Sequence, residues 1–369
     1  MVLPALRHRA LFRPDRLNVL NLTALAPASG SQRASRLRPR LACERNRPHG
    51  YPVKKKDKSV KFDRLLDPEY AAFLDEPMSQ WTLSELPAIR ARIDASYKAM
   101  DQARGEQRWI TSPLDGHSLR LCVYRPARQS AASLPAMLYI HGGGFVLGRP
   151  EMADDYLAGL AQELEVLIVA VDYRLAPEHP FPVPLQDCYR ALEWIFEQSK
   201  SLQVDPARVV IMGHSAGGGL AAATAILARD KGEHQLAGLL MVYPMLDHRT
   251  GQAQDDNPTT GHLSWTREAN RFCWQRMQGC YALDDQRQAH FSPALADDLS
   301  GLPASFLSVG ALDLFLDEGV AFALQLSRCA VPVELHVYPG VPHMFDQHPG
   351  AVTQQSADDI LRALKKMIA

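Results

Sequence analysis

The sequence predicts an α/β protein with a mostly parallel sheet, and two observations carry that prediction. From residue 136 onward, short apolar runs alternate with helical patterns, an order that implies a parallel sheet with helices on both faces. The apolar run 209–212 leads through Gly213-His214-Ser215-Ala216-Gly217 into a small-residue helical segment, 216–228. This strand–turn–helix is the stretch around which the other elements are organised.

The first elements precede that alternation. Asp67 and Pro68 open a helix through residue 74, as a cap and a first helical residue. A second helical pattern covers 82–101. The segment 109–125 predicts a hairpin that turns at Asp115-Gly116. The two helices must lie over some surface of the main fold, so we expect them to form part of a cap.

The alternating part follows in order: strand 136–140, helix 153–164, strand 166–171, helix 185–198, strand 209–212, helix 216–228, strand 236–243, strand 305–309, helix 316–328, strand 333–338 and helix 351–368. One polar stretch with a helical middle, 248–287, breaks this order and is predicted to be an insertion between strands.

The G-x-S-x-G at 213–217 predicts a sharp turn that exposes the Ser215 hydroxyl. A side chain at either glycine would collide across the turn. A purely structural glycine-rich turn is the alternative. A nucleotide-binding loop is disfavoured because no G-K-[ST] follows.

A nucleophilic serine needs a base, and the base needs an orienting acid. Functional residues of open α/β sheets lie beyond the carboxyl ends of strands. Asp313 follows the strand 305–309 and His343 follows the strand 333–338. We therefore expect Ser215, Asp313 and His343 to form a triad.

Three other residues are weaker candidates for the acid or the base of this triad. Asp317 lies at a predicted helix start, where a carboxylate more often caps. His336 falls inside a strand, and His348 lies in a predicted exposed loop.

The run His141-Gly142-Gly143-Gly144 predicts an oxyanion-binding loop. Without side chains, the main chain can approach a substrate and direct N–H groups at developing negative charge. We expect the N–H groups of Gly142, Gly143 and Ala216 to serve this purpose. His141 is expected to hold the loop rather than to transfer protons.

Together, HGGGF at 141–145, DYRLAPEHPFP at 172–182, GHSAGG at 213–218, DLFLDEG at 313–319 and PHMF at 342–345 resemble the hormone-sensitive-lipase-like branch of the α/β-hydrolases. The resemblance covers roughly 105–369. It implies the α/β-hydrolase fold with an eight-stranded sheet and a helical cap. It also implies a carboxylesterase acting on short or medium acyl esters without a metal or cofactor.

The chain departs from that pattern at His214, where many members carry Asp or Thr. We expect Asp172 and Arg174 to form a structural ion pair behind the site, and Glu178 to brace the H-G-G-G loop.

The expected organisation is a single catalytic domain, 61–369, with cap elements 61–105 and 250–287. Cap side chains would set the acyl preference. The candidates for the substrate pocket are Trp265, Phe272 and, beside the oxyanion loop, Phe145.

Residues 1–60 form a basic leader with 14 Lys and Arg against three acidic residues, a net charge of +11. Because the whole chain has a net charge of −1, the remaining residues have a net charge of −12. Its composition is typical of disordered segments. A targeting presequence and a tail for nucleic acid or another anionic surface are alternatives to an unstructured extension, which we favour. The segment 17–28 is too short to span a bilayer.

The six cysteines form no C-x-x-C pair, which favours free thiols in a reducing, cytoplasmic compartment. The expected partner is a small ester rather than nucleic acid, with a homodimer left open. Amide, formamide or lactone cleavage by the same triad is the nearest functional alternative. A non-catalytic binding protein is the alternative from another class.

Overall fold

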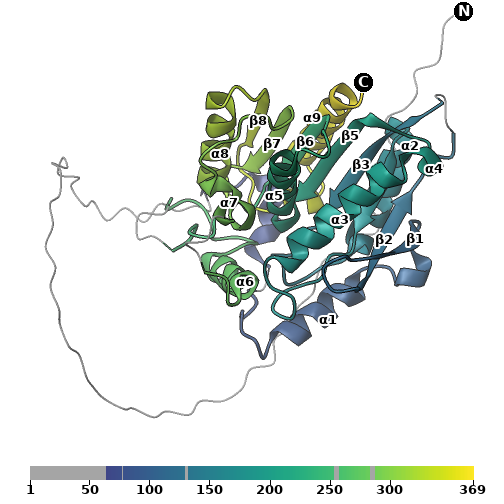
Figure 1. Ribbon diagram of the computed structural model, residues 1–369. Coiled ribbons are helices and arrows are strands. Elements are labelled where there is room, and N and C mark those ends of the chain that lie inside the picture. Colours follow the sequence, from purple (N-terminus) through teal and green to yellow (C-terminus); the bar gives the residue numbers. More distant parts are fainter. Residues whose placement is uncertain (1–63, 77, 129–131, 253–256, 283–286) are drawn as a thin grey trace, which may run out of the picture.

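An eight-stranded sheet runs through the computed structural model in the order β1-β2-β4-β3-β5-β6-β7-β8 (Figure 1). The structure describes residues 64–76, 78–128, 132–252, 257–282 and 287–369. The strands are β1 Glu106–Thr111, β2 Ser118–Tyr124, β3 Leu134–Ile140, β4 Leu167–Val171, β5 Val204–His214, β6 Gly238–Val242, β7 Ser305–Gly310 and β8 Val333–Tyr338.

The sheet is antiparallel only at its beginning. β1 and β2 form the predicted hairpin, β2 lies antiparallel to β4, and every other neighbouring pair is parallel. All residues of β3, β4, β6 and β7 are buried. Continuous apolar runs of this kind belong to strands covered on both faces, so the predicted fold class is confirmed.

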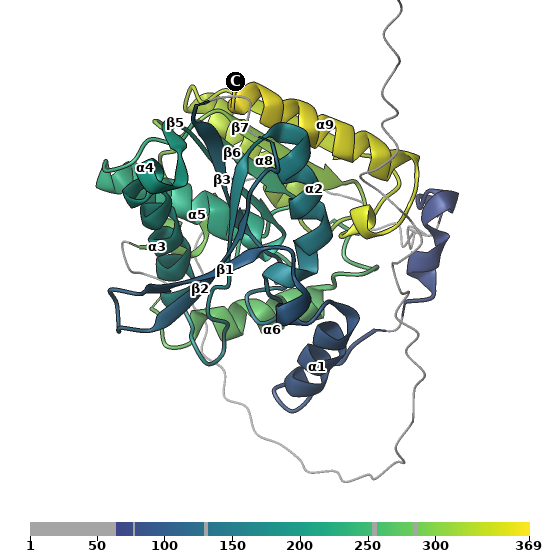
Figure 2. The same ribbon diagram turned by 90° about the vertical axis from the view of Figure 1, so that its right-hand side faces the viewer.

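Helices supply that cover. α3 and α5 lie on one face of the sheet, and α2 and α9 lie on the other (Figure 2). The helices are α1 Leu86–Ser96, α2 Asp154–Leu164, α3 Val183–Glu197, α4 Ser199–Leu202, α5 Ala216–Lys231, α6 Arg267–Gln278, α7 Gln288–Phe291, α8 Leu316–Arg328 and α9 Ala351–Met367. Short 3-10 turns cover Pro68–Leu74, Met100–Gln102, Pro150–Ala153, Pro293–Leu295 and Phe345–Gln347.

The helix predicted over 82–101 is shorter than expected. α1 ends at Ser96 because Tyr97 is extended, with φ −116° and ψ 164°. The predicted start at Asp67 is present as a cap, whose carboxylate accepts the N–H of Glu69 at 2.9 Å. The turn that follows, Pro68–Leu74, is a 3-10 helix rather than an α-helix.

Two segments far apart in the sequence meet at one end of the sheet. α1 and α6 lie near each other there (Figures 1 and 2). The ring of Trp81, which precedes α1, packs 5.4 Å from Trp265 and 5.9 Å from Phe272 of the α6 region. These contacts bring together described parts of the two expected cap elements, 61–105 and 250–287.

The predicted leader, 1–60, lies outside the described residues. Within the described ranges, no helix combines the length and apolar character needed to cross a bilayer. Five of the six cysteines fall in those ranges, and all five are free thiols.

Candidate active site

Ser215 occupies a strained turn between β5 and α5, with φ 54° and ψ −121°. Such a conformation persists only where the surroundings hold it. Here the Ser215 N–H donates to Val242 O at 2.9 Å, and its carbonyl accepts the N–H of Met245 at 3.0 Å. A Cβ on Gly213 would lie 2.1 Å from Gly217 O, so the turn closes only with glycine at 213. The predicted collision across the turn is therefore present at Gly213, whereas a Cβ on Gly217 would instead lie 2.1 Å from Ile140 O of the neighbouring strand β3.

His343 lies between Ser215 and Asp313. Its Nε2 is 2.9 Å from Ser215 Oγ, and its Nδ1 is 2.7 Å from Asp313 Oδ2. The other carboxylate oxygen of Asp313 accepts the N–H of Phe315 at 2.9 Å, which fixes the direction of the carboxylate. All three predicted residues are buried, with exposures of 5, 1 and 0 % for Ser215, His343 and Asp313. This is a hydroxyl–imidazole–carboxylate chain with hydrogen-bond geometry at each step.

The rival residues take partners elsewhere. Asn257 donates to Asp317 at 3.4 Å, His336 pairs with Glu334 at 2.7 Å, and His348 lies 3.4 Å from Glu76. None of these contacts includes Ser215.

The glycine loop 142–144 approaches the nucleophile. A Cβ on Gly142 would lie 3.0 Å from His214 O and 3.3 Å from the Ser215 Cβ. Gly142 and Gly143 are partly exposed, whereas Ala216 is buried as the first residue of α5. The structure therefore places two of the expected N–H donors on an accessible loop and the third at the start of the helix behind Ser215.

His141 supports this loop from behind. Its Nδ1 lies 2.7 Å from Gly142 O, and its ring stacks on Tyr173 with centroids 4.2 Å apart. Burial lowers the pKa of His141 to about 4, so the imidazole is neutral at pH 7.

Arg90 of α1 is a residue that sequence reasoning missed. Its guanidinium donates to Val146 O and Ala176 O, both at 2.8 Å, and binds Glu178 with two bonds at 2.8 and 2.9 Å. Glu178 thus reaches the loop after Gly144 through Arg90. One arginine in a helical pattern gives no signal of this role.

The expected pair of Asp172 with Arg174 is wrong. Asp172 pairs with Arg120 of β2 at 2.9 Å, and Arg174 binds Asp187 of α3 with bonds of 2.7 to 3.0 Å. Arg120 and Asp187 lie on two different elements, β2 and α3, so each of the two side chains takes its partner from another part of the fold.

The three pocket candidates differ in how close they lie to the triad. The Trp265 ring lies 6.0 Å from His343, and a Cβ on Gly144 would lie 2.6 Å from its Cη2. Phe272 contacts Trp81, which in turn contacts Trp265. The Phe145 ring is 2 % exposed and packs 5.0 Å from Trp274. Trp265 is the candidate that contacts the triad, and Trp81 is a neighbour that the sequence did not indicate.

A polar cluster beside His343 was also missed. The Tyr243 hydroxyl donates to both carboxylate oxygens of Asp346, at 2.8 and 2.9 Å, and the Tyr243 ring lies 4.6 Å from His343. His214 Nε2 lies 3.8 Å from Asp346 Oδ2. Nothing in the spacing of these residues marks them as neighbours.

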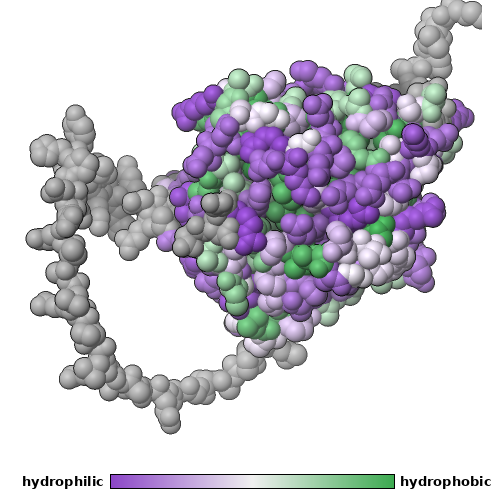
Figure 3. Space-filling model, in the orientation of Figure 1, coloured by the Kyte–Doolittle hydropathy of each residue, from purple (hydrophilic) through white to green (hydrophobic). Residues whose placement is uncertain are grey.

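Among the hollows on the described surface, one of about 590 Å³ and one of about 390 Å³ are open, and no triad member lines either of these two. The face drawn in Figure 3 is mostly hydrophilic, with apolar side chains in small, separate groups. Among the described residues, no group of three His, Cys, Asp or Glu side chains is placed to hold a metal ion.

Comparisons with known proteins support the fold described above. Residues 137–347 match a family model described as alpha/beta hydrolase fold. The chain is 32 % identical over 257 residues to ethyl acetate hydrolase of Pseudomonas putida, covering 69 % of this chain and 79 % of that one. It is 30 % identical over 298 residues to an arylesterase of Saccharolobus solfataricus, covering 76 % and 92 %.

Solved structures of esterases share the fold of this chain. A bacterial heroin esterase superposes with a TM-score of 0.74 at 35 % identity, over 83 % of this chain and 99 % of that one. An esterase from Pyrobaculum calidifontis superposes with a TM-score of 0.69 at 29 % identity, over 82 % and 100 %. With the family model, the relatives and the shared fold, the chain belongs to the hormone-sensitive-lipase-like branch of the α/β-hydrolase family.

Proposed function

We propose that this protein hydrolyses short- to medium-chain carboxylic esters through an acyl-enzyme formed on Ser215. The observation that carries the proposal is the buried chain from Ser215 Oγ through His343 to Asp313, with steps of 2.9 and 2.7 Å. A serine, a base within reach of it and a carboxylate that orients the base are the parts that acyl transfer requires.

In the proposed reaction, His343 Nε2 takes the proton from Ser215 Oγ as the oxygen attacks the ester carbonyl. Asp313 holds the Nδ1–H and stabilises the imidazolium that forms. His343 then gives the proton to the leaving alkoxide, which departs as the alcohol. Water repeats the sequence on the acyl-enzyme and releases the carboxylic acid.

Negative charge develops on the carbonyl oxygen in both steps. We assign its stabilisation to the N–H groups of Gly142, Gly143 and Ala216, in keeping with the approach of the glycine loop to Ser215. Arg90 would support the oxyanion-binding loop indirectly, because it holds the chain after Gly144 at Val146 O.

The substrate class is drawn from the relatives and from the aromatic contacts. The similar proteins include an ethyl acetate hydrolase, an arylesterase and several carboxylesterases. Trp265 and its neighbours Trp81 and Phe272 lie close to the site, which favours acyl groups of limited length over long chains.

A series of nitrophenyl esters of increasing acyl length tests the proposal, together with a matched nitrophenyl amide. We expect the highest kcat/KM between acetyl and medium acyl lengths, and a much lower value for the amide. Ser215→Ala should lower kcat by several powers of ten, because loss of a triad member usually does so.

Active-site labelling checks the role of Ser215 independently. A fluorophosphonate should add to Ser215 in the wild-type protein and to no residue in Ser215→Ala, as read by peptide mass spectrometry. Ser215→Ala that kept about a tenth of wild-type turnover, or a label on another residue, would contradict the assignment.

A further inference from the structure

A carboxylate with little compensating charge lies beside the triad. Asp346 follows His343 by three residues and is 23 % exposed. Both of its oxygens accept the same Tyr243 hydroxyl, which is a neutral donor. Among ion pairs within the described ranges, its partner is His214, at 3.8 Å. That separation exceeds a hydrogen bond.

His214 does not neutralise this carboxylate at pH 7. Burial lowers the pKa of His214, and the nearby His343 lowers it further, against the opposing effect of Asp346. The imidazole is therefore mainly uncharged at neutral pH, and the negative charge of Asp346 remains available to another cation.

Tyrosine rings surround His214, the neighbour of Asp346. The rings of Tyr139, Tyr156 and Tyr243 lie 5.6, 6.0 and 5.7 Å from the His214 ring. Burial raises the pKa of Tyr156, and the negative charge of Asp346 raises it further, in keeping with the position of its ring beside His214. The site thus combines one carboxylate with several electron-rich rings.

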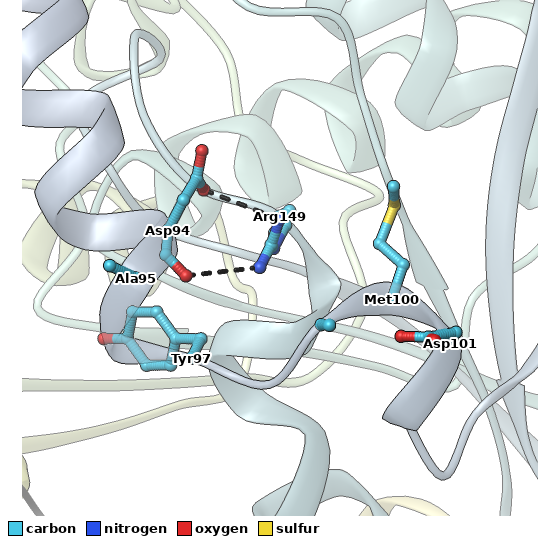
Figure 4. A pocket seen from close by; sticks show the side chains of 7 residues that line it. Asp94, Ala95, Tyr97, Met100, Asp101 and Arg149 are labelled. Carbon is cyan, nitrogen blue, oxygen red and sulfur yellow. Dashed lines mark hydrogen bonds and ion pairs between the residues drawn. The ribbon is translucent and has the colours of Figure 1, made fainter.

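Tyr97 lines the hollow of about 590 Å³, together with Asp94, Asp101 and Arg149 (Figure 4). The Arg149 guanidinium lies 3.7 Å from Asp94 and 3.6 Å from Glu151, so its charge is already shared with carboxylates. The hollow thus carries charges of both signs, and Asp346 does not line it.

We propose that Asp346, with the rings of Tyr156 and Tyr243, binds an ammonium group carried by the ester substrate. This inference rests on the proposed esterase function and names the substrate class. A carboxylate attracts the cation, and tyrosine faces stabilise it further while tolerating the bulk of a substituted ammonium.

The ammonium group belongs to the alcohol part of the ester. His343 delivers the proton to the leaving oxygen, so the alcohol lies on the His343 side of the carbonyl carbon. The Tyr243 ring lies 4.6 Å from His343 while its hydroxyl binds Asp346. An ammonium a few atoms from the leaving oxygen would therefore face this cluster.

The test uses three acetate or ethyl esters: choline acetate, its uncharged isostere dimethylbutyl acetate, and betaine ethyl ester, which carries the cation on the acyl side. In the wild-type protein, we expect kcat/KM for choline acetate to exceed that for the isostere by about tenfold, in line with one partly screened ion pair and cation–π contact. The preference should shrink as salt is added. Betaine ethyl ester, whose ammonium activates the carbonyl by itself, should show no such preference over the ethyl ester of the matching uncharged acid once each value is divided by the rate of hydroxide-catalysed hydrolysis.

Asp346→Asn keeps an acceptor for Tyr243 but removes the charge, and should bring the choline-to-isostere ratio close to one. Tyr243→Phe keeps the charge and should retain most of the preference. Asp101→Asn, at the rim of the hollow, should also retain it. Tetramethylammonium should inhibit nitrophenyl acetate hydrolysis by the wild-type protein competitively, and about tenfold more weakly in Asp346→Asn.

A wild-type ratio near one, or an unchanged ratio in Asp346→Asn, would overturn the ammonium site while leaving ester hydrolysis intact. Equal loss of both substrates in Asp346→Asn and Tyr243→Phe would overturn it in favour of a purely structural role. Failure of the wild-type protein on every ester, uncharged ones included, would overturn the proposed function and this inference with it.

Discussion

The carboxylate of Asp313 and the imidazole of His343 meet at 2.7 Å in surroundings that leave them 0 and 1 % exposed. The two loops that carry them are joined by main-chain bonds: Ala311 N donates to Tyr338 O at 2.8 Å, and Leu312 N donates to Val341 O at 3.0 Å. Their relative position is therefore set by adjacent parallel strands, β7 and β8, rather than by side-chain flexibility.

Asp313→Asn should reduce kcat by several powers of ten, because an amide cannot stabilise the imidazolium and favours the wrong tautomer of His343. Asp317→Asn is the matched control, since its carboxylate faces Asn257. It should stay within a few-fold of wild type. Steady-state rates on nitrophenyl acetate compare them, and equal rates in the two variants would reject Asp313 as the orienting acid.

Much of the fold and the triad could be predicted because their signals are local in the chain. The G-x-S-x-G turn, the H-G-G-G loop and the polar residues after β7 and β8 each lie within a few residues of the strand that positions them. The roles of Arg90 and Asp346 could not be predicted in this way. Arg90 meets Val146 across 56 residues, and Tyr243 meets Asp346 across 103. Such pairs depend on how the elements pack.

The same limit explains the error at Asp172 and Arg174. Their closeness in sequence suggested a mutual pair, but the sheet and α3 offer each a separate partner, Arg120 and Asp187. Both residues do form ion pairs, but tertiary packing decides which partner each of them meets.

Trp265→Ala should change acyl selectivity because it opens space beside His343 and Gly144. We expect the ratio of kcat/KM for octanoyl over acetyl nitrophenyl esters to rise, by a few-fold to tenfold, since apolar pocket contacts contribute about 1–3 kcal/mol per methylene at most. Phe272→Ala should shift the ratio less, because it reaches Trp265 through Trp81.

Phe145→Leu is the control for this experiment. Its ring packs on Trp274, so the substitution should lower the melting temperature and leave the octanoyl-to-acetyl ratio near wild type. A uniform fall on all esters in Trp265→Ala would mean that Trp265 supports closure or stability, and the pocket assignment would be lost.

Arg90→Ala should lower kcat/KM on nitrophenyl acetate by about tenfold, because it removes two charge-assisted bonds to the carbonyls of Val146 and Ala176. Glu178→Gln should have a smaller effect, since Arg90 keeps both carbonyl contacts when its carboxylate partner is neutral. Glu178 is 54 % exposed, and exposed ion pairs contribute little. Equal losses in the two variants would show that the ion pair, not the carbonyl contacts, positions the loop.

The lowered pKa of His141 predicts how the free energy of unfolding depends on pH. Burial lowers its pKa from 6.5 to about 4, and its buried Nε2 has no hydrogen-bond partner within the described residues, so the folded state favours the neutral ring. The unfolded chain therefore binds a proton first as the pH falls. The contribution of His141 is fully present above pH 6.5 and is lost progressively between pH 6.5 and 4. Between pH 7 and 5, this loss is about 2 kcal/mol.

His141→Asn removes the titrating ring while its amide can still donate to Gly142 O. The free energy of unfolding, measured by urea denaturation at pH 7 and pH 5, should then differ between the two pH values by about 2 kcal/mol less than in the wild-type protein. His214 and the buried His248 also have lowered pKa values, but they are common to both proteins and cancel in the comparison. His117→Asn, at an exposed position, should keep the wild-type difference. If His141→Asn kept it too, the acid sensitivity would arise elsewhere, and His141 would not be held neutral behind the oxyanion loop.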